Sequence, residues 1–552
     1  MTRSSQVLLF LWETFFYKWL MNRILFLFLI SFSFSLTAHA QFNPNRVTTS
    51  LKFKEVIDKV SMYYVDDTDA EKLTETAIVA LLEELDPHST YIPKEDLQAA
   101  QTAINGSFVG VGIRFQILKD TLNVVATISG GPAEKLGILP GDKIVVVDGI
   151  NIAGIGLKNS DVREKLMGEL GSKVKVEVKR KRAKSNLTFN ITRDKIPVFS
   201  VDSHYMIDQN TGYIKLNSFS RTTVYEVRNA LRALKKKGMK NLIFDLQGNG
   251  GGLLDAAHKL SDEFLSGEKL IVYSEGRAQP RNNLRAGIQG NFERGKLIVL
   301  TDEYSASASE ILSGSIQDWD RGLVVGRRTF GKGLVQRPMG LSDGSEVRLT
   351  IARYYTPTGR FIQKPYDDVD SYRKDISERY LNGEFVHSDS IKMPDSLKFK
   401  TLIKKRTVFG GGGIMPDVFV PLDTLGVSDY FSDLLRGGFL NNFSYDYTNE
   451  NRKALTKKYP EFSDFYENFS CDEPFMELFF KYVAEEDSTL LFNKEEYETS
   501  KNLIALRLKA YLARNLWDTN EFYQVFNASN TILNRAIGIL NSKEYDKMDL
   551  DN

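Results

Sequence analysis

Residues 296 to 316 constrain the fold of this chain more than any other stretch. An apolar strand, 296 to 300, is followed by alternating serine and alanine at 305 to 309 and then by a helix with one apolar face. This pattern predicts a strand, a sharp turn and a helix. The first-turn N–H groups of that helix point outward above Ser307, where the helix dipole favours negative charge. A hydroxyl at Ser307 therefore has an anion site beside it.

A second feature is Lys332, which lies between two glycines inside an apolar stretch. A serine hydroxyl is a weak nucleophile until a neighbouring base takes its proton. Burial disfavours the charged ammonium, so a lysine in such a stretch can act as a general base. Taken singly, each feature has a simpler interpretation, which is tight helix packing for the serines and a solvated turn for the lysine. Their combination favours a catalytic pair.

Length and composition limit the classes of protein that need to be considered. At 552 residues and 42% hydrophobic content, the chain is long enough for several globular domains. A net charge of +1 predicts no attraction to nucleic acid. The single cysteine, Cys471, excludes an intrachain disulfide, and the five histidines include no His-Glu-x-x-His zinc pattern. We expect no metal and no cofactor.

The amino terminus has the pattern of an export signal. Met21-Asn22-Arg23 gives a basic start, residues 24–36 an apolar core, and Ala38-His39-Ala40 a cleavage site of small residues. We expect residues 1–40 to be a signal peptide, with 1–20 as an extension, and the mature chain to work in a periplasm, near the membrane. A membrane anchor formed by residues 7–20 and 24–36 together is the alternative, although neither of these apolar stretches reaches about 20 residues.

The pattern changes along the rest of the chain indicate four parts. Residues 41–103 have helical spacing, and 104–193 read as short strands with glycine turns. Residues 194–423 alternate strands with helices, which predicts a mostly parallel sheet, and carry a polar insertion at 364–409 that we expect over the surface. Residues 424–552 form aromatic-rich helices whose apolar faces need cover, either from the core or from a second copy in a homodimer.

A glycine-rich loop follows the strand that ends at Asp245. It reads Gln247-Gly248-Asn249-Gly250-Gly251-Gly252 and lacks the phosphate-binding pattern of a P-loop. Sites collect at the carboxyl ends of parallel strands, so we expect this loop beside Ser307. His258, in the helix that follows, leaves a Ser-His-Asp triad with Asp245 as an alternative to the lysine.

Two motifs carry a resemblance to a known family. Ser-Ala-Ser-Ala-Ser-Glu at 305–310, followed by Thr-Phe-Gly-Lys-Gly-Leu-Val-Gln at 329–336, resembles the C-terminal processing (tail-specific) proteases, which use a Ser/Lys dyad. The resemblance implies a crotonase-like (ClpP-like) α/β core with Ser307 as nucleophile, Lys332 as base and Gln336 as the residue that orients the lysine. Because glycines flank the lysine, we expect the chain to bend there.

The same resemblance implies an oxyanion hole. Its donors would be the N–H of Gly251 or Gly252 and, as the second donor, the N–H of Ala308. Two positions depart from the family, because Gln247 and Met167 stand where its members have arginine.

The second part of the chain, 104–193, resembles a PDZ domain. Phe108-Val109-Gly110-Val111-Gly112-Ile113 stands in the place of the loop that binds a peptide's terminal carboxylate. N–H groups around the two glycines form an anion nest, and the next strand edge lets a peptide add as a strand. An ordinary glycine-rich hairpin is the alternative. Before this domain, Asp86-Pro87-His88-Ser89 resembles a turn of the same family, and we interpret His88 as structural rather than catalytic.

These features predict an exported serine endopeptidase whose partners are proteins or peptides with free C-termini. Its PDZ domain would bind the tails, and the Ser/Lys dyad would cut them. The first alternative is a scaffold that binds tails without cutting. A weaker one is an intracellular oligopeptide hydrolase with a related core.

Overall fold

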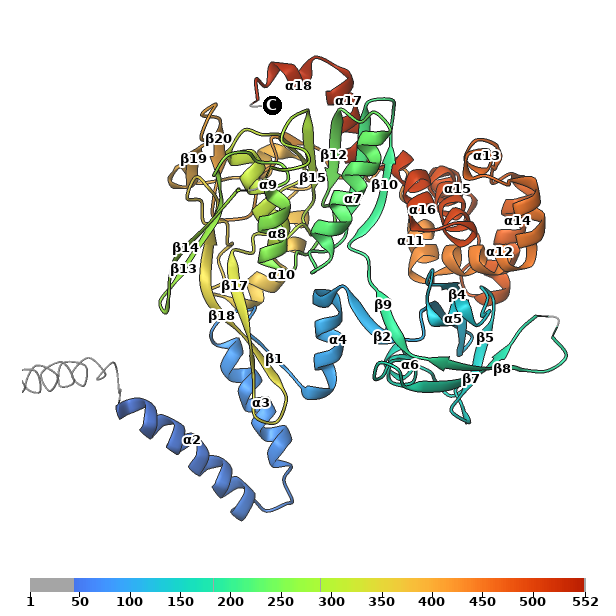
Figure 1. Cartoon of the computed structure of the whole chain (residues 1–552), viewed down its shortest axis with the longest axis horizontal. Coiled ribbons are helices and arrows are strands. Elements are labelled where there is room, and N and C mark those ends of the chain that lie inside the picture. Colours follow the sequence, from blue (N-terminus) through green and yellow to red (C-terminus); the bar gives the residue numbers. More distant parts are fainter. Residues whose placement is uncertain (1–43, 182, 288, 551–552) are drawn as a thin grey trace, which may run out of the picture. The chain divides into compact units, whose positions relative to one another are not determined.

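The computed structural model describes residues 44–181, 183–287 and 289–550 (Figure 1). The predicted signal peptide, residues 1–40, lies outside the described residues. The chain forms two units, of which the first ends at Leu81 and contains helix α2 (Pro44–Tyr63) and most of α3 (Ala70–Glu83). None of the helices in the described ranges has both the length and the apolar character to cross a membrane.

The second unit begins with a short strand and a helix, and a β-rich domain follows. A sheet in the order β3-β4-β5-β7-β8, with β6 beside β5, surrounds a core of buried valine and isoleucine side chains. Strands β2 and β9 pair with each other where the chain enters and leaves this domain. The elements are β1 (Thr90–Ile92), α4 (Lys94–Asn105), β2 (Ser107–Gly110), β3 (Ile113–Leu118), β4 (Thr121–Thr127), α5 (Pro132–Lys135), β5 (Lys143–Val147), β6 (Ile150–Asn151), α6 (Asn159–Leu166), β7 (Lys173–Lys179), β8 (Leu187–Thr192) and β9 (Asp194–Pro197).

A six-stranded sheet forms the centre of the α/β part, in the order β10-β11-β12-β15-β16-β21. Only β10 runs antiparallel to its neighbour, so the other strands end at one edge. The strands are β10 (Val201–Met206), β11 (Thr211–Leu216), β12 (Asn241–Asp245), β15 (Leu297–Thr301), β16 (Leu323–Gly326) and β21 (Val418–Phe419).

Helices cover both faces of this sheet because its strands alternate their apolar side chains. Leu242 and Phe244 of β12 pack with helices α7 (Thr223–Lys236), α8 (Leu254–Ser261) and α9 (Ala308–Asp318), which Figure 1 shows together over the sheet. Ile243 points to the other face, where it joins side chains of α17 (Thr531–Asn541) in a separate core. Full burial on both faces is what parallel sheets require.

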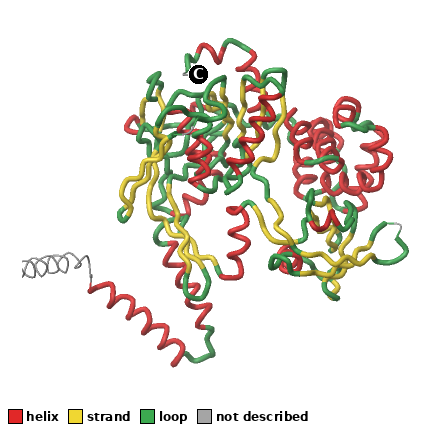
Figure 2. Tube along the Cα trace, in the orientation of Figure 1, coloured by secondary structure: helices red, strands yellow, loops and turns green. Residues whose placement is uncertain are grey.

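A second, antiparallel sheet carries the lysine motif. Its order is β1-β18-β13-β14, and β17 pairs with β18. Figure 2 draws all strands in yellow, in the orientation of Figure 1. The strands from the α/β part are β13 (Leu270–Gly276), β14 (Gln279–Arg285), β17 (Leu334–Gly340) and β18 (Glu346–Tyr355). Strand β1 comes from ahead of the β-rich domain and pairs antiparallel with β18, Thr90 opposite Arg348. This sheet is thus completed by residues far upstream in the sequence.

The carboxyl-terminal helices form their own aromatic core. They are α11 (Asp429–Arg436), α12 (Phe439–Lys458), α13 (Phe462–Asn468), α14 (Glu473–Glu486), α15 (Lys494–Leu516) and α16 (Thr519–Phe526). Beyond them, α17 and α18 (Glu544–Lys547) supply apolar side chains to the central sheet, which is one of the two expected kinds of cover. With the amino-terminal helices, the β-rich domain and the α/β core, these helices confirm the predicted multidomain fold class.

Most residues of the insertion at 364–409 are exposed or half-buried, and a few of its side chains pack inward. It contains α10 (Val369–Leu381), β19 (Lys398–Lys400) and β20 (Thr407–Phe409), and several of its polar side chains are buried. Arg379 of α10 donates to the carbonyl oxygens of Arg328 (2.7 Å) and Thr329 (3.2 Å). Glu384 forms ion pairs with the guanidinium groups of Arg328 and Arg379. The insertion therefore braces the loop that leads to Lys332.

Candidate active site

Ser307 stands at the turn between β15 and α9. Its backbone has φ +56° and ψ −110°, a left-handed conformation that residues with a side chain adopt only under strain. The residues around it, except Tyr304, are buried, whereas Ser307 is half-buried. The strand, turn and helix predicted from the sequence thus place the Ser307 side chain above the carboxyl edge of the sheet. Strained residues of this kind cluster at functional sites.

The buried carboxylate of Glu310 connects this turn to the lysine loop. Oε2 accepts hydrogen bonds from the N–H of Ser307 (2.8 Å) and the N–H of Lys332 (2.9 Å). Oε1 accepts from the N–H of Gly331 (2.7 Å) and the hydroxyl of Thr329 (2.5 Å). Burial raises the pKa of Glu310 to about 7, and the four donors hold that pKa lower than burial alone would. One carboxylate thus fixes both halves of the candidate dyad.

Sequence reasoning gave Glu310 no role, although it is part of the quoted motif. The signal that could have found it is its spacing, because it stands three residues after the serine that precedes the helix. A glutamate at that position commonly reaches back to the backbone N–H of the capping residue. Here it does so and also binds a second segment of the chain.

Lys332 lies in an irregular loop just before β17. Gly331 has φ +87°, and a β-carbon there would approach Gly413 N to 3.1 Å, so the bend requires glycine. The hydroxyl of Tyr354 contacts the carbonyl oxygens of both Lys332 and Ser307. Burial lowers the pKa of Lys332 below its ordinary value, while the carboxylates of Asp86 and Glu310 raise it. The expected bend is present, and it brings the lysine backbone beside that of the serine.

The side chains of the candidate dyad are not hydrogen-bonded to each other. Within the described residues, no hydrogen bond joins Lys332 Nζ to Ser307 Oγ or to Gln336. Gln336 instead donates from Nε2 to Thr350 Oγ1 at 3.1 Å. The structure therefore brings the three predicted residues to one region, and their roles as nucleophile, base and orienter stay predictions.

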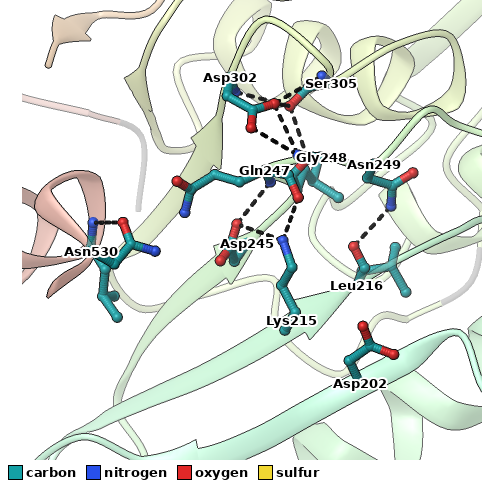
Figure 3. Close-up of polar contacts among 12 residues, drawn as sticks. Asp202, Lys215, Leu216, Asp245, Gln247, Gly248, Asn249, Asp302, Ser305 and Asn530 are labelled. Carbon is teal, nitrogen blue, oxygen red and sulfur yellow. Dashed lines mark hydrogen bonds and ion pairs between the residues drawn. The ribbon is translucent and has the colours of Figure 1, made fainter. Parts of the chain in front are cut away.

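The glycine loop is held from below by a buried polar cluster (Figure 3). Asp245 accepts from the N–H of Gln247 (2.8 Å) and from Lys215 Nζ (3.3 Å), which also donates to the carbonyl oxygen of Gln247. Asp302 accepts from the N–H of Gly248 at 2.9 Å. The positive charge beneath the loop thus comes from Lys215 and not from residue 247.

The upper part of the loop approaches Ser307 closely, as predicted. A β-carbon on Gly251, which has φ +99°, would lie 2.8 Å from Ser307 Cβ, so only glycine fits. The N–H of Gly251 donates to Asn249 Oδ1 at 2.8 Å. Among the residues that the structure describes, the N–H groups of Gly252 and Ala308 have no acceptor. This favours Gly252 over Gly251 as the loop's oxyanion donor.

The two histidines considered from the sequence have different surroundings. His258 Nε2 lies 2.8 Å from the carbonyl oxygen of Arg285, and Asp245 binds Tyr213 and Lys215 instead, so the triad alternative is not assembled. His88 Nε2 lies 2.6 Å from the hydroxyl of Tyr372. Burial, and after it the charge of Lys332, lowers the pKa of His88 to about 4. The turn that carries His88 therefore borders the candidate site.

The candidate peptide groove is a pocket of about 70 Å³ between β3 and α6. It is lined by Phe108, Val111, Gly112, Ile113, Phe115, Val162, Arg163, Leu166 and Met167. The N–H groups of Val111 and Gly112 have no acceptor among the described residues, and Gly112 has φ +79°. These two groups can receive a carboxylate. Val109 and Gly110 belong to β2, which pairs with β9, and do not line the pocket.

Comparisons with known proteins identify the domains that carry the two candidate sites. A profile described as peptidase family S41 matches residues 210–371, a PDZ domain profile matches 124–180, and a family of unknown function matches 430–518. The carboxy-terminal processing protease CtpA of Bacillus subtilis is 35% identical over 314 residues, which are 57% of this chain and 66% of that protein. The carboxy-terminal-processing protease of Bartonella bacilliformis is 35% identical over 319 residues, 56% of this chain and 72% of that protein.

Among solved structures, the photosystem II D1 C-terminal processing protease is 29% identical and aligns with 68% of this chain and 94% of its own, with a TM-score of 0.35. The two profiles identify a serine peptidase that also carries a PDZ domain. The chain belongs to peptidase family S41, among the carboxy-terminal processing proteases. This confirms the resemblance drawn from residues 305–310 and 329–336.

Replacing Glu310 with glutamine should impair catalysis strongly while the chain still folds. The amide has one acceptor oxygen where the carboxylate has two. An NH₂ in the place of Oε2 would face the N–H groups of both Ser307 and Lys332, and an NH₂ in the place of Oε1 would face the N–H of Gly331, so buried donors lose their acceptor in either orientation. Leaving buried donors unpaired costs about 1–3 kcal/mol, and we expect kcat to fall about 10- to 100-fold. Steady-state kinetics with a tail peptide would measure this. Glu378→Gln, an exposed change on α10, is the control, and wild-type kcat in Glu310→Gln would contradict the role of the carboxylate.

Proposed function

We propose that this chain is an exported endopeptidase that captures the carboxyl-terminal tails of substrate proteins in its PDZ domain and cleaves them at Ser307. The observation that carries the proposal is the shared carboxylate of Glu310, which holds the backbones of Ser307 and Lys332 together beside the glycine loop. The export pattern of residues 21–40 supports a periplasmic location.

In the proposed reaction, Lys332 in its neutral form rotates to Ser307 and takes the proton of Oγ. The oxygen attacks the peptide carbonyl, and the N–H groups of Gly252 and Ala308 stabilise the oxyanion. The C–N bond then breaks, and the leaving amine takes the proton from the Lys332 ammonium. Water then gives a proton to Lys332 and attacks the acyl carbonyl, the ester bond to Oγ breaks, and Oγ takes the proton back from the lysine, which releases the acid and regenerates Ser307.

Cleavage of a tail peptide by the chain from Gln41 onward tests the proposal. We expect new fragments from the wild type and a loss of at least about a thousandfold in rate for Ser307→Ala and Lys332→Ala. Each variant removes either the nucleophile or its base, and neither works without the other. His258→Ala is the control and should keep its activity. If the wild type binds the peptide but produces no fragment, the scaffold alternative is favoured. If Lys332→Ala keeps its activity, the general base is not Lys332, and the histidine alternative is favoured.

The rate should fall as the pH is lowered. Only neutral lysine accepts the proton, and because burial lowers the pKa of Lys332 below 10.5, the neutral fraction grows as pH rises through that lowered value and is lost below it. We expect log kcat/KM to have an acid limb with a slope near one. Peptide cleavage measured across the pH range would show it, and a flat profile down to about pH 5 would argue against Lys332 as the base.

The tail pocket should require a free terminal carboxylate. A carboxamide loses the charge that the N–H groups of Val111 and Gly112 receive, and hydrogen bonds to charged groups contribute about 1.5–3 kcal/mol. We expect peptide amides to bind about 10- to 100-fold more weakly than the acids. Fluorescence anisotropy with Ser307→Ala protein would measure both peptides without cleavage, and equal affinities would place tail recognition elsewhere.

A further inference from the structure

The reaction proposed above makes no use of the turn Asp86-Pro87-His88-Ser89. The turn precedes the PDZ domain in sequence, and the strand that follows it, β1, is part of the same sheet as β17 and β18. Asp86 is buried, with 6% of its surface exposed. The burial and the contacts of Asp86 indicate that it does more than stabilise the turn.

Asp86 first fixes its own orientation. Oδ1 accepts from the N–H of His88 (2.8 Å) and the N–H of Ser89 (2.9 Å), and Oδ2 accepts from the hydroxyl of Ser89 (2.6 Å). These are the contacts of a common aspartate turn. A turn of this kind can form at the surface, so it does not explain why the carboxylate is buried against another segment.

The remaining contact leads out of the turn toward the lysine motif. Thr350 Oγ1 lies 3.1 Å from Asp86 Oδ1, and Gln336 Nε2 lies 3.1 Å from Thr350 Oγ1. Gln336 and Thr350 stand opposite each other on β17 and β18. The N–H of Thr350 also donates to Ser89 Oγ at 3.1 Å, which holds Thr350 in place. Asp86 and Thr350 both line a cleft of about 730 Å³, so this chain of contacts borders open space.

The chemistry of Asp86, Thr350 and Gln336 decides which group donates and which accepts in each of these hydrogen bonds. An ionised carboxylate can only accept, so the single proton of the Thr350 hydroxyl is directed to Asp86. The hydroxyl oxygen then accepts from the NH₂ of Gln336. Oε1 of Gln336 is therefore the end of the amide that remains available to accept a hydrogen bond from an amine.

We propose that Asp86 is a positioning residue of the catalytic centre, which acts through Thr350 to turn the carbonyl oxygen of Gln336 toward the amine of Lys332. The inference rests on the proposed roles of Ser307 and Lys332. It also assigns a task to the Asp-Pro-His-Ser turn that the sequence alone left as structural.

Electrostatics supports the assignment. The charged groups that face Lys332 are the carboxylates of Asp86 and Glu310, which raise its pKa, and the guanidinium of Arg348, which lowers it. His88 also faces it and is neutral at pH 7, since its pKa is lowered to about 4. Removing the charge of Asp86 should therefore lower the pKa of Lys332.

The full chain with Asp86→Asn tests the proposal. We expect kcat to fall about tenfold or more at unchanged KM, because asparagine can donate to Thr350 and so no longer fixes the direction of the chain. We also expect the acid limb of the pH profile to move down by about one pH unit, since a neighbouring negative charge is lost. A purely structural turn would move neither.

Two further variants separate the chain of contacts from the turn itself. Thr350→Val removes the hydroxyl that links Asp86 to Gln336 and leaves the turn intact, so it should lower kcat as Asp86→Asn does. Thr350→Ser keeps a hydroxyl and should restore kcat. The matched control is Asp343→Asn, because Asp343 forms a similar turn with Ser345 but has no contact leading to Gln336. If Asp86→Asn does not fold, Thr350→Val decides, and wild-type kcat in it would overturn the proposal.

A measurement without cleavage distinguishes this proposal from the proposed function. Nuclear magnetic resonance of ¹³C-labelled lysine in Ser307→Ala protein gives the pKa of Lys332, with Lys332→Arg assigning the signal. A lower value after Asp86→Asn supports the positioning role even if the wild type cuts no peptide, in which case only the proposed function fails. An unchanged value and unchanged kcat overturn the positioning role and leave the function standing.

Discussion

The arrangement of the active site depends on one buried carboxylate that accepts hydrogen bonds from two distant segments. Glu310 belongs to the first turn of α9, yet two of its four donors are backbone N–H groups of the lysine loop. It shares the task of joining the strained turn at Ser307 to the bend at Gly331 with the Tyr354 hydroxyl and with a backbone hydrogen bond from the N–H of Phe330 to the carbonyl oxygen of Ser305. Burial makes the interaction strong and also makes the loss of any donor costly, which suits a site that must hold its geometry.

The supports around this carboxylate come from every part of the α/β fold. Lys215 and Asp302 hold the glycine loop from the ends of β11 and β15, the strands on either side of β12. Arg379 of the inserted helix α10 binds the carbonyl oxygens just before the lysine loop. Tyr354 reaches both halves of the dyad from β18. The candidate site is thus held in place by side chains from several strands and helices.

Sequence reasoning found the fold class and the motif residues because these have local signals. Short stretches of sequence are enough to predict the strand, turn and helix around Ser307 and the bend at the glycines beside Lys332. It gave Glu310 and Thr350 no role and treated Asp86 as part of a structural turn, because the contacts that join Glu310 to Thr329, Gln336 to Thr350 and Thr350 to Asp86 span 14 to 264 residues and no local pattern reveals them. It also did not predict that Arg379 and Glu384, within the polar segment 364–409, are buried as an ion pair.

Strand β1 changes what counts as the catalytic domain of this protein. The S41 profile begins at residue 210, but the sheet that β17 joins directly after Lys332 includes residues 90–92, and the PDZ domain lies between the two in sequence. The PDZ domain is therefore an insertion within the peptidase fold and not a module attached ahead of it, and its two connections run side by side as β2 and β9. A gene fragment starting at the S41 profile would encode a peptidase missing one of its own strands, and the smallest autonomous enzyme must instead begin before the Asp-Pro-His-Ser turn.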